Sequence, residues 1–176
     1  MSKEVLYVAG SPSPASRSSY VASVALLAVR REGLGTRSFS LRDFDPADVF
    51  HARVDAPGVK DFVAAARGAA AIVLSTPVYK GTYAGGLKAI VDLIPHDALI
   101  GRPALGIATT RAVAHEEGVE QGYRALFAFF GADALESLVL SDDEVRVENG
   151  DGSIGLEAYA RVEAAARALV AAIRAR

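Results

Sequence analysis

Short apolar runs that each stop at a polar loop are the feature of this sequence that most constrains its fold. Val-Leu-Tyr-Val-Ala at 5–9 stops at a Gly-Ser-Pro turn, and Ala-Ala-Ile-Val-Leu at 70–74 stops at Ser-Thr-Pro. Runs of this length without polar alternation are typical of strands buried on both faces. Further strands are expected at 36–41, 103–108 and 135–140.

Segments with helical periodicity separate these strands. In 18–31 the apolar residues recur every three or four positions, and two glycines follow as stop signals. Comparable segments occupy 59–66, 87–94, 114–130 and 156–176. Five strands that alternate with helices predict an α/β fold, with a parallel sheet covered by helices on both faces.

Three stretches depart from this alternation. Residues 43–57 contain two prolines and no clear period, which predicts a surface excursion. Residues 145–152 end in Asn-Gly and Asp-Gly pairs, which are turn signals and predict a small β excursion. Two glycines within 117–123 predict a local departure from α geometry, since each costs a helix about 1 kcal/mol relative to alanine.

The length, composition and charge of the chain limit the kinds of site and partner that it can have. The 176 residues carry no recognisable linker or repeat, so a single domain over 1–176 is expected. Cysteine is absent and histidine occurs three times, which excludes disulfides, thiolate catalysis and iron–sulfur clusters and makes a metal site unexpected. The formal charge of −2 and the lack of a long apolar run argue against nucleic-acid and membrane partners, so a soluble cytoplasmic protein is expected.

The loop after the first strand, GSPSPASRSS at 10–19, leads directly into a predicted helix. Serine hydroxyls, the unpaired N–H groups of the first helical turn and Arg17 together suit a phosphate group. In the simpler alternative, one serine caps the helix and the others are solvated. The phosphate candidates are Ser11, Ser16, Arg17, Ser18 and Ser19.

Two further loops follow the strands at 70–74 and 103–108. The first places Tyr79 and Tyr83 beside proline and glycine, which suits a flat ring held by main-chain hydrogen bonds, although both tyrosines could instead pack on the next helix. The second carries Thr109, Thr110 and Arg111, and the backbone amides of this loop could reach the same ring. The guanidinium of Arg111 could bind a second, anionic ligand or stay in solvent.

These segments resemble the NADPH-dependent FMN reductases of the flavodoxin-like fold, and most of all the reductases that supply reduced flavin to alkanesulfonate monooxygenases. The resemblance runs from about residue 4 to about residue 140 and rests on GSPSPASRSS, TPVYKGTYAGGLKAIVDLIP and ATTRAVAH. It implies a three-layer sandwich with five parallel strands in the order 2-1-3-4-5. It also implies FMN between the first and third strands, and a homodimer or homotetramer.

The resemblance also implies roles for individual residues. Ser11, Ser16, Ser18 and Ser19 with Arg17 would hold the FMN phosphate. The isoalloxazine would be lined by Pro77, Val78, Tyr79 and Lys80, with Tyr83 and Gly85 closing the same loop. The family typically has arginine where this chain has Ser13, and commonly two glycines where it has Thr110 and Arg111.

The leading hypothesis is therefore an NAD(P)H:FMN oxidoreductase that takes hydride from NADPH or NADH and supplies reduced flavin to a partner monooxygenase. Both reacting atoms belong to FMN and the nicotinamide, so no catalytic side chain is required. Lys80 and Arg111 are candidate contacts for the nicotinamide phosphates or for the flavin N1 region. Two alternatives stay open: an FMN-bound quinone or azo reductase, and a flavodoxin-like electron carrier without turnover.

Overall fold

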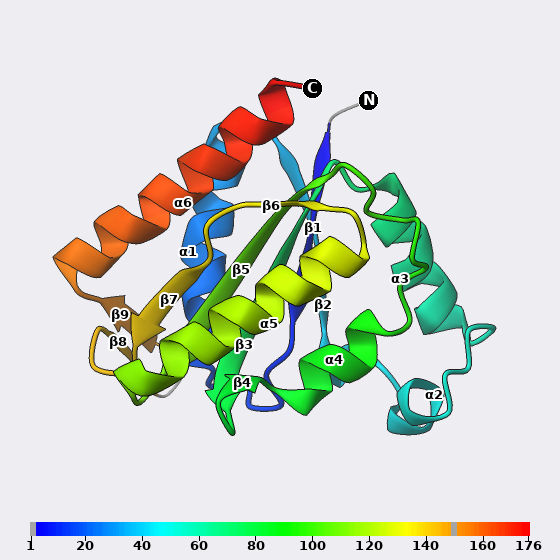
Figure 1. The fold of residues 1–176 in the computed structure, drawn as a ribbon, viewed down its shortest axis with the longest axis horizontal. Coiled ribbons are helices and arrows are strands. Elements are labelled where there is room, and N and C mark those ends of the chain that lie inside the picture. Colours follow the sequence, from blue (N-terminus) through cyan, green and yellow to red (C-terminus); the bar gives the residue numbers. More distant parts are fainter. Residues whose placement is uncertain (1–2, 149–150) are drawn as a thin grey trace.

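A parallel sheet forms the centre of the structure, a computed structural model that describes residues 3–148 and 151–176. Strands β1 (Glu4–Ala9), β2 (Gly35–Ser40), β3 (Ala71–Tyr79) and β5 (Pro103–Thr110) lie in the order β2-β1-β3-β5 (Figure 1). Two short strands, β6 (Asp133–Ala134) and β7 (Leu138–Ser141), both pair with β5 and occupy the fifth position. The predicted order 2-1-3-4-5 is confirmed.

Helices cover both faces of this sheet (Figure 1). α1 (Arg17–Arg31) and α6 (Leu156–Arg174) lie on one face, and α3 (Pro57–Gly68), α4 (Gly85–Val91) and α5 (Glu116–Phe129) lie on the other. Each face has its own apolar core, because the side chains of a buried strand alternate between the two layers. Thus Leu6 packs under the α3–α5 layer, while its neighbours Val5 and Tyr7 pack under α1 and α6.

The fifth strand is split, where a continuous strand over 135–140 was expected. The Leu135 amide still donates to the Ala104 carbonyl at 2.9 Å, but the chain then leaves the sheet through Glu136 and Ser137. Strand β7 resumes opposite Ile107. The apolar pattern located this strand correctly, and the interruption falls at the polar residues Glu136 and Ser137.

The excursion expected at 43–57 is tied to the core. It begins at the last residue of the 3-10 turn η1 (Leu41–Asp43) and contains the short helix α2 (Pro46–Phe50), which Asp45 caps by accepting from the Ala47 amide at 2.7 Å. Phe44 is buried with its ring centroid 5.4 Å from that of Phe62 on α3. The segment therefore runs over the surface while one aromatic side chain anchors it.

The expected β excursion is a hairpin of β8 (Val145–Glu148) and β9 (Asp151–Ile154). Residues 149 and 150, the first predicted turn pair, lie outside the described residues. The second pair, predicted as a turn, instead forms part of β9, where Gly152 pairs with Val147. A Cβ at Gly152 would lie 2.3 Å from the Tyr20 ring, so glycine here allows the hairpin to pack on α1.

Within residues 3–148 and 151–176, none of the helices combines the length and the apolar character that crossing a membrane requires. The helix α5 is preceded by a 3-10 turn, η2 (Val113–His115), so the helix expected from residue 114 begins slightly later as regular α-helix.

Candidate functional site

A pocket of about 530 Å³ opens at the carboxyl ends of β1, β3 and β5. This is the edge where parallel α/β sheets bind ligands, close to the point at which the strand order reverses. Many of the predicted site residues line it: Ser11, Ser16, Arg17, Pro77, Val78, Tyr79, Lys80, Thr109 and Arg111. The remaining lining residues are Ser13, Ala15, His115 and Asp142.

The loop at 10–19 leaves β1 through a tightly packed glycine. The Gly10 amide donates to the Ser75 carbonyl at 2.8 Å, and a Cβ on Gly10 would lie 2.4 Å from Cβ of Leu87. The Ser13 amide donates to Oγ of Ser11 at 3.2 Å, which turns the chain around the pocket wall. Glycine at position 10 is thus required for β1 to pass into this loop beside α4.

The serines at the start of α1 have different surroundings. Ser16 caps the helix: its Oγ accepts from the Ser19 amide at 3.2 Å and lies 3.0 Å from Oγ of Ser18. Ser16 also lines the pocket, so the same residue caps the helix, as the simpler alternative expected, and faces the ligand site. Ser18 is fully buried, and neither it nor Ser19 lines the pocket.

A buried hydroxyl pair lies beneath this loop. The hydroxyls of Tyr7 on β1 and Ser75 on β3 are 2.8 Å apart, and both side chains are buried. Burial raises the pKa of Tyr7, while hydrogen bonds from Ser75 and Ser19 oppose the rise. Tyr7 therefore stays protonated at neutral pH and joins β1 to β3 through its contact with Ser75.

The second wall of the pocket is a tight hairpin. β3 turns back into β4 (Thr82–Tyr83), with Tyr79 opposite Thr82. The two turn residues, Lys80 and Gly81, have φ of 55° and 87°, as a two-residue type I′ turn requires. The Ala84 amide donates to the buried Oγ1 of Thr76 at 2.9 Å. The hairpin presents Tyr79, which is half-exposed, and Lys80 to the pocket.

Helix α5 packs directly against this hairpin through two glycines. A Cβ at Gly118 would lie 2.2 Å from the Gly81 carbonyl oxygen, and one at Gly122 would lie 2.6 Å from Oγ1 of Thr82. The predicted departure from α geometry is wrong, because α5 is a continuous α-helix from Glu116 to Phe129. The two glycines are explained instead by the closeness of the hairpin, a contact that no local pattern reveals.

The two hairpin tyrosines have different roles. Tyr83 does not line the pocket; its ring centroid lies 6.2 Å from that of Tyr123, as the packing alternative expected. The Tyr123 hydroxyl is fully buried, 2.8 Å from the Ile107 carbonyl oxygen, and burial raises its pKa well above the ordinary value. Gly85 starts α4 and also lies outside the pocket lining.

The loop after β5 closes the third side. Thr109 is buried and lines the pocket, whereas the Thr110 side chain turns back on its own loop. Oγ1 of Thr110 accepts from the Ala112 amide at 3.3 Å and donates to the Ala112 carbonyl at 3.1 Å. His115 is exposed and also lines the pocket.

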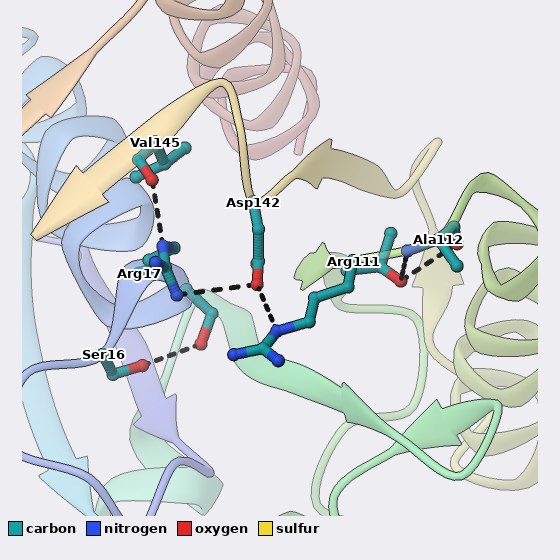
Figure 2. A network of polar contacts seen from close by, with 8 residues as sticks. Ser16, Arg17, Arg111, Ala112, Asp142 and Val145 are labelled. Carbon is teal, nitrogen blue, oxygen red and sulfur yellow. Dashed lines mark hydrogen bonds and ion pairs between the residues drawn. The ribbon is translucent and has the colours of Figure 1, made fainter.

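A carboxylate joins two arginines across the pocket (Figure 2). Oδ2 of Asp142 lies 3.5 Å from Nη1 of Arg17 and 3.3 Å from Nε of Arg111. Arg17 also donates from Nε to the Val145 carbonyl at 3.0 Å. Asp142 is a site residue that the sequence reasoning missed, although it follows a predicted strand and so lies at the ligand-binding edge of the sheet.

These residues fit a planar ligand with an anionic group. Arg17, Lys80 and Arg111 outnumber the single carboxylate of Asp142, and serine hydroxyls lie beside Arg17. The hairpin supplies an aromatic ring and the backbone of Pro77 and Val78. The volume lies in the range of small-molecule sites. In the part of the chain that the structure describes, no group of three or more His, Asp or Glu side chains is arranged to hold a metal ion.

The family model described as NADPH-dependent FMN reductase matches residues 4–149, most of the chain. The chain belongs to this family. An FMN reductase (NADPH) of Pseudomonas putida KT2440 is 33% identical over 147 residues, which cover 83% of this chain and 75% of the relative. Membership makes this reductase an NAD(P)H:FMN oxidoreductase, so the predicted enzyme class, FMN and a nicotinamide electron donor are confirmed.

Solved structures agree with this assignment. The apo form of EMOB, an NADH:FMN oxidoreductase, has a TM-score of 0.84 and 26% identity, with 96% of this chain and 88% of that chain covered. A flavodoxin from Streptococcus pneumoniae TIGR4 has a TM-score of 0.63 at 15% identity, with 97% and 99% covered, and shows the fold alone. The reductase therefore has the flavodoxin-like architecture expected from its sequence.

Proposed function

We propose that this reductase binds FMN as an exchangeable substrate and passes the reduced flavin to a flavin-dependent monooxygenase. The observation that carries the proposal is that groups which would grip the ligand remain in contact with solvent. The Arg111 side chain is 88% exposed and Tyr79 is half-exposed. A flavin held in this way can leave without any rearrangement of the core.

We assign the FMN phosphate to the loop at 10–19. Ser11 and Ser16 offer hydroxyls at the pocket wall, and Arg17 offers a guanidinium at the start of α1. Ser18 and Ser19 contribute through the first turn of α1, whose N–H groups and dipole favour an anion. The buried contact between Tyr7 and Ser75 joins the ends of β1 and β3, from which the loops on two sides of the pocket start.

We assign the isoalloxazine to the β3–β4 hairpin. Pro77, Val78, Tyr79 and Lys80 line this side of the pocket. Tyr83 and Gly85 act indirectly, Tyr83 by packing the hairpin on Tyr123 and Gly85 by starting the helix that follows. Thr109 and Arg111 line the third side of the pocket, where we propose that they contact the ring, and Thr110 acts indirectly through its hydrogen bonds to Ala112.

When bound, FMN supplies the hydride-accepting chemistry of the reaction. The protein binds and orients the two ring systems, so we assign no catalytic side chain. Lys80 and Arg111 are proposed contacts for the phosphates of the nicotinamide donor, which leaves both NADPH and NADH as candidates. Because these coenzymes are cytoplasmic, we propose that the reductase works in the cytoplasm.

We further propose that residues 1–176 act as one domain and assemble as a homodimer or homotetramer. The two apolar cores share one sheet, which supports a single folding unit. The outer surface of α5 supports self-association, because Phe129 is 71% exposed beside exposed Ala125 and Ala128. Exposed aromatic side chains next to small residues are typical of subunit contacts.

The test combines desalting with a rate assay. Purified protein is passed over a desalting column, and NADPH or NADH oxidation is followed at the nicotinamide band with and without added FMN. We expect little flavin to remain after desalting and oxidation to depend on added FMN. Flavin retained in equal amount with the protein, together with reduction of a quinone or azo dye without added FMN, would instead support a tightly bound cofactor.

A further inference from the structure

The carboxylate of Asp142 occupies a fixed place at the pocket. Its amide donates to the Thr110 carbonyl at 2.8 Å, which joins the end of β7 to the end of β5. The side chain is only 20% exposed and turns between Arg17 and Arg111 (Figure 2). Asp142 is also the one carboxylate among the described residues that line the pocket.

Holding the arginines in place does not require this carboxylate. Arg17 already belongs to the first turn of α1, and its Nε donates to the Val145 carbonyl at 3.0 Å. Arg111 is almost fully exposed, and ion pairs at exposed positions contribute roughly 0–1 kcal/mol. The main effect of Asp142 is therefore electrostatic: it places a negative charge where the pocket otherwise attracts anions.

We propose that Asp142 is a built-in competitor for the phosphate group of FMN. This inference rests on the proposed function, since it takes the phosphate to bind near Arg17. Asp142 engages Nη1 of Arg17, a donor that the phosphate would otherwise take. The bound phosphate then shares the guanidinium with a carboxylate and is repelled by it.

This competition lowers the affinity for FMN and speeds its release. A reductase that hands reduced flavin to another enzyme needs such a limit, because tight retention would block each transfer. Ligands without a phosphate, such as riboflavin, do not meet the repulsion. The charge of Asp142 thus acts on the phosphate-bearing flavin and leaves recognition of the ring unchanged.

If Asp142 instead helped to bind the phosphate, removing its charge would change the FMN affinity in the opposite direction. If Asp142 oriented the arginines for the phosphate, removing its charge would weaken FMN binding. If Asp142 competes with the phosphate, removing its charge tightens FMN binding. Asp142→Asn keeps the size of the side chain and one acceptor oxygen, but it removes the charge and replaces the second oxygen with an NH₂ donor. Asp142→Ser removes the charge without adding that NH₂ group, so the sign of the effect in both variants separates the two cases.

Titration of the flavin-free protein with FMN and with riboflavin, followed by flavin fluorescence, tests the proposal. For Asp142→Asn we expect the Kd for FMN to fall by roughly three- to tenfold and the Kd for riboflavin to stay unchanged, with the difference shrinking at high salt. Asp143→Asn is the matched control, because Asp143 is exposed, adjacent and outside the pocket lining. We expect it to leave both constants unchanged.

The inference would be overturned by weaker FMN binding in Asp142→Asn, by an equal change for riboflavin, or by an equal gain in Asp143→Asn. Asp142→Ser, compared by thermal unfolding and the same titration, covers the case in which the asparagine variant folds poorly. A wild-type protein that binds no FMN would instead refute the proposed function, and the inference would fall with it. Wild-type binding without a gain in either Asp142 variant refutes the inference alone.

Discussion

Gly118 of α5 lies so close to the turn at Gly81 that a Cβ on residue 118 would be 2.2 Å from the Gly81 carbonyl oxygen. The helix therefore packs against the back of the β3–β4 hairpin and limits its position, and this hairpin carries Tyr79 and Lys80 into the pocket. Because the contact is between a helix backbone and a turn backbone, neither side can yield by a rotamer change. The position of one pocket wall thus depends on a residue outside the pocket.

Replacing this glycine should displace the hairpin. Gly118→Ala is expected to destabilise the fold by about 1–3 kcal/mol, as overpacking does, and to weaken FMN binding through Tyr79 and Lys80. Gly68→Ala is the matched control, because Gly68 is also helical and a Cβ there meets nothing within 4 Å. Urea unfolding measures the stability of both variants, and titration with FMN measures their affinity. A Gly118→Ala protein as stable as the Gly68→Ala protein would show that the hairpin is free to move.

The phosphate assignment predicts a ligand-specific loss. Arg17→Gln should raise the Kd for FMN by roughly ten- to hundredfold, since hydrogen bonds to charged groups contribute about 1.5–3 kcal/mol. Riboflavin, which lacks the phosphate, should bind as before. Arg31→Gln removes the same charge at the far end of α1 and should change neither constant. Equal losses for FMN and riboflavin in Arg17→Gln would place the phosphate elsewhere.

High pH should destabilise the fold through Tyr123. Burial raises the pKa of this hydroxyl well above 10.0, so the unfolded chain loses the proton first. The contribution of Tyr123 to stability is full below about pH 10 and falls above it by up to about 1.4 kcal/mol per pH unit. Tyr123→Phe should make this decline shallower in urea unfolding.

Part of the alkaline decline should remain in that variant, since burial also raises the pKa of Tyr7. Tyr159→Phe on α6 serves as the comparison, because its hydroxyl reaches Glu163 from a half-buried position. Identical alkaline slopes for the wild-type, Tyr123→Phe and Tyr159→Phe proteins would contradict the role given to burial.

Self-association through α5 predicts a monomerising substitution. Phe129→Glu places a charge on the exposed outer face of α5 and should shift the protein toward the monomer in light scattering after size exclusion. Phe50→Glu makes the same change on α2, where the ring is 83% exposed, and should leave the mass unchanged. A monomeric wild-type protein, or equal effects of both substitutions, would rule out this interface.

Local patterns located the strand ends and therefore most of the pocket, because strands that end in polar loops place those loops at one edge of a parallel sheet. Ser16 and Arg17 were found in this way, whereas Lys80 was assigned from the family resemblance. Asp142 was missed because its ion pair with Arg17 depends on how β7 lies beside β5. Its signal was present, since Ser-Asp-Asp at 141–143 directly follows a predicted strand.

Tertiary packing explains the other differences. Gly118 and Gly122 read as weak points in a helix, whereas their neighbours across space make them necessary. The same holds for Gly152, a predicted turn residue that lies in β9, where a Cβ would be 2.3 Å from the Tyr20 ring. Helix and turn propensities describe a residue and its sequence neighbours, so close approaches between distant segments escape them.

A crystal structure of the protein with FMN tests the central claim most directly. We expect flavin density in the pocket at the carboxyl ends of β1, β3 and β5, with the phosphate within hydrogen-bond distance of Ser11, Ser16 and Arg17. The isoalloxazine should lie against the β3–β4 hairpin beside Tyr79. Flavin bound at any other surface, or a phosphate remote from the loop at 10–19, would contradict the assignment of this site.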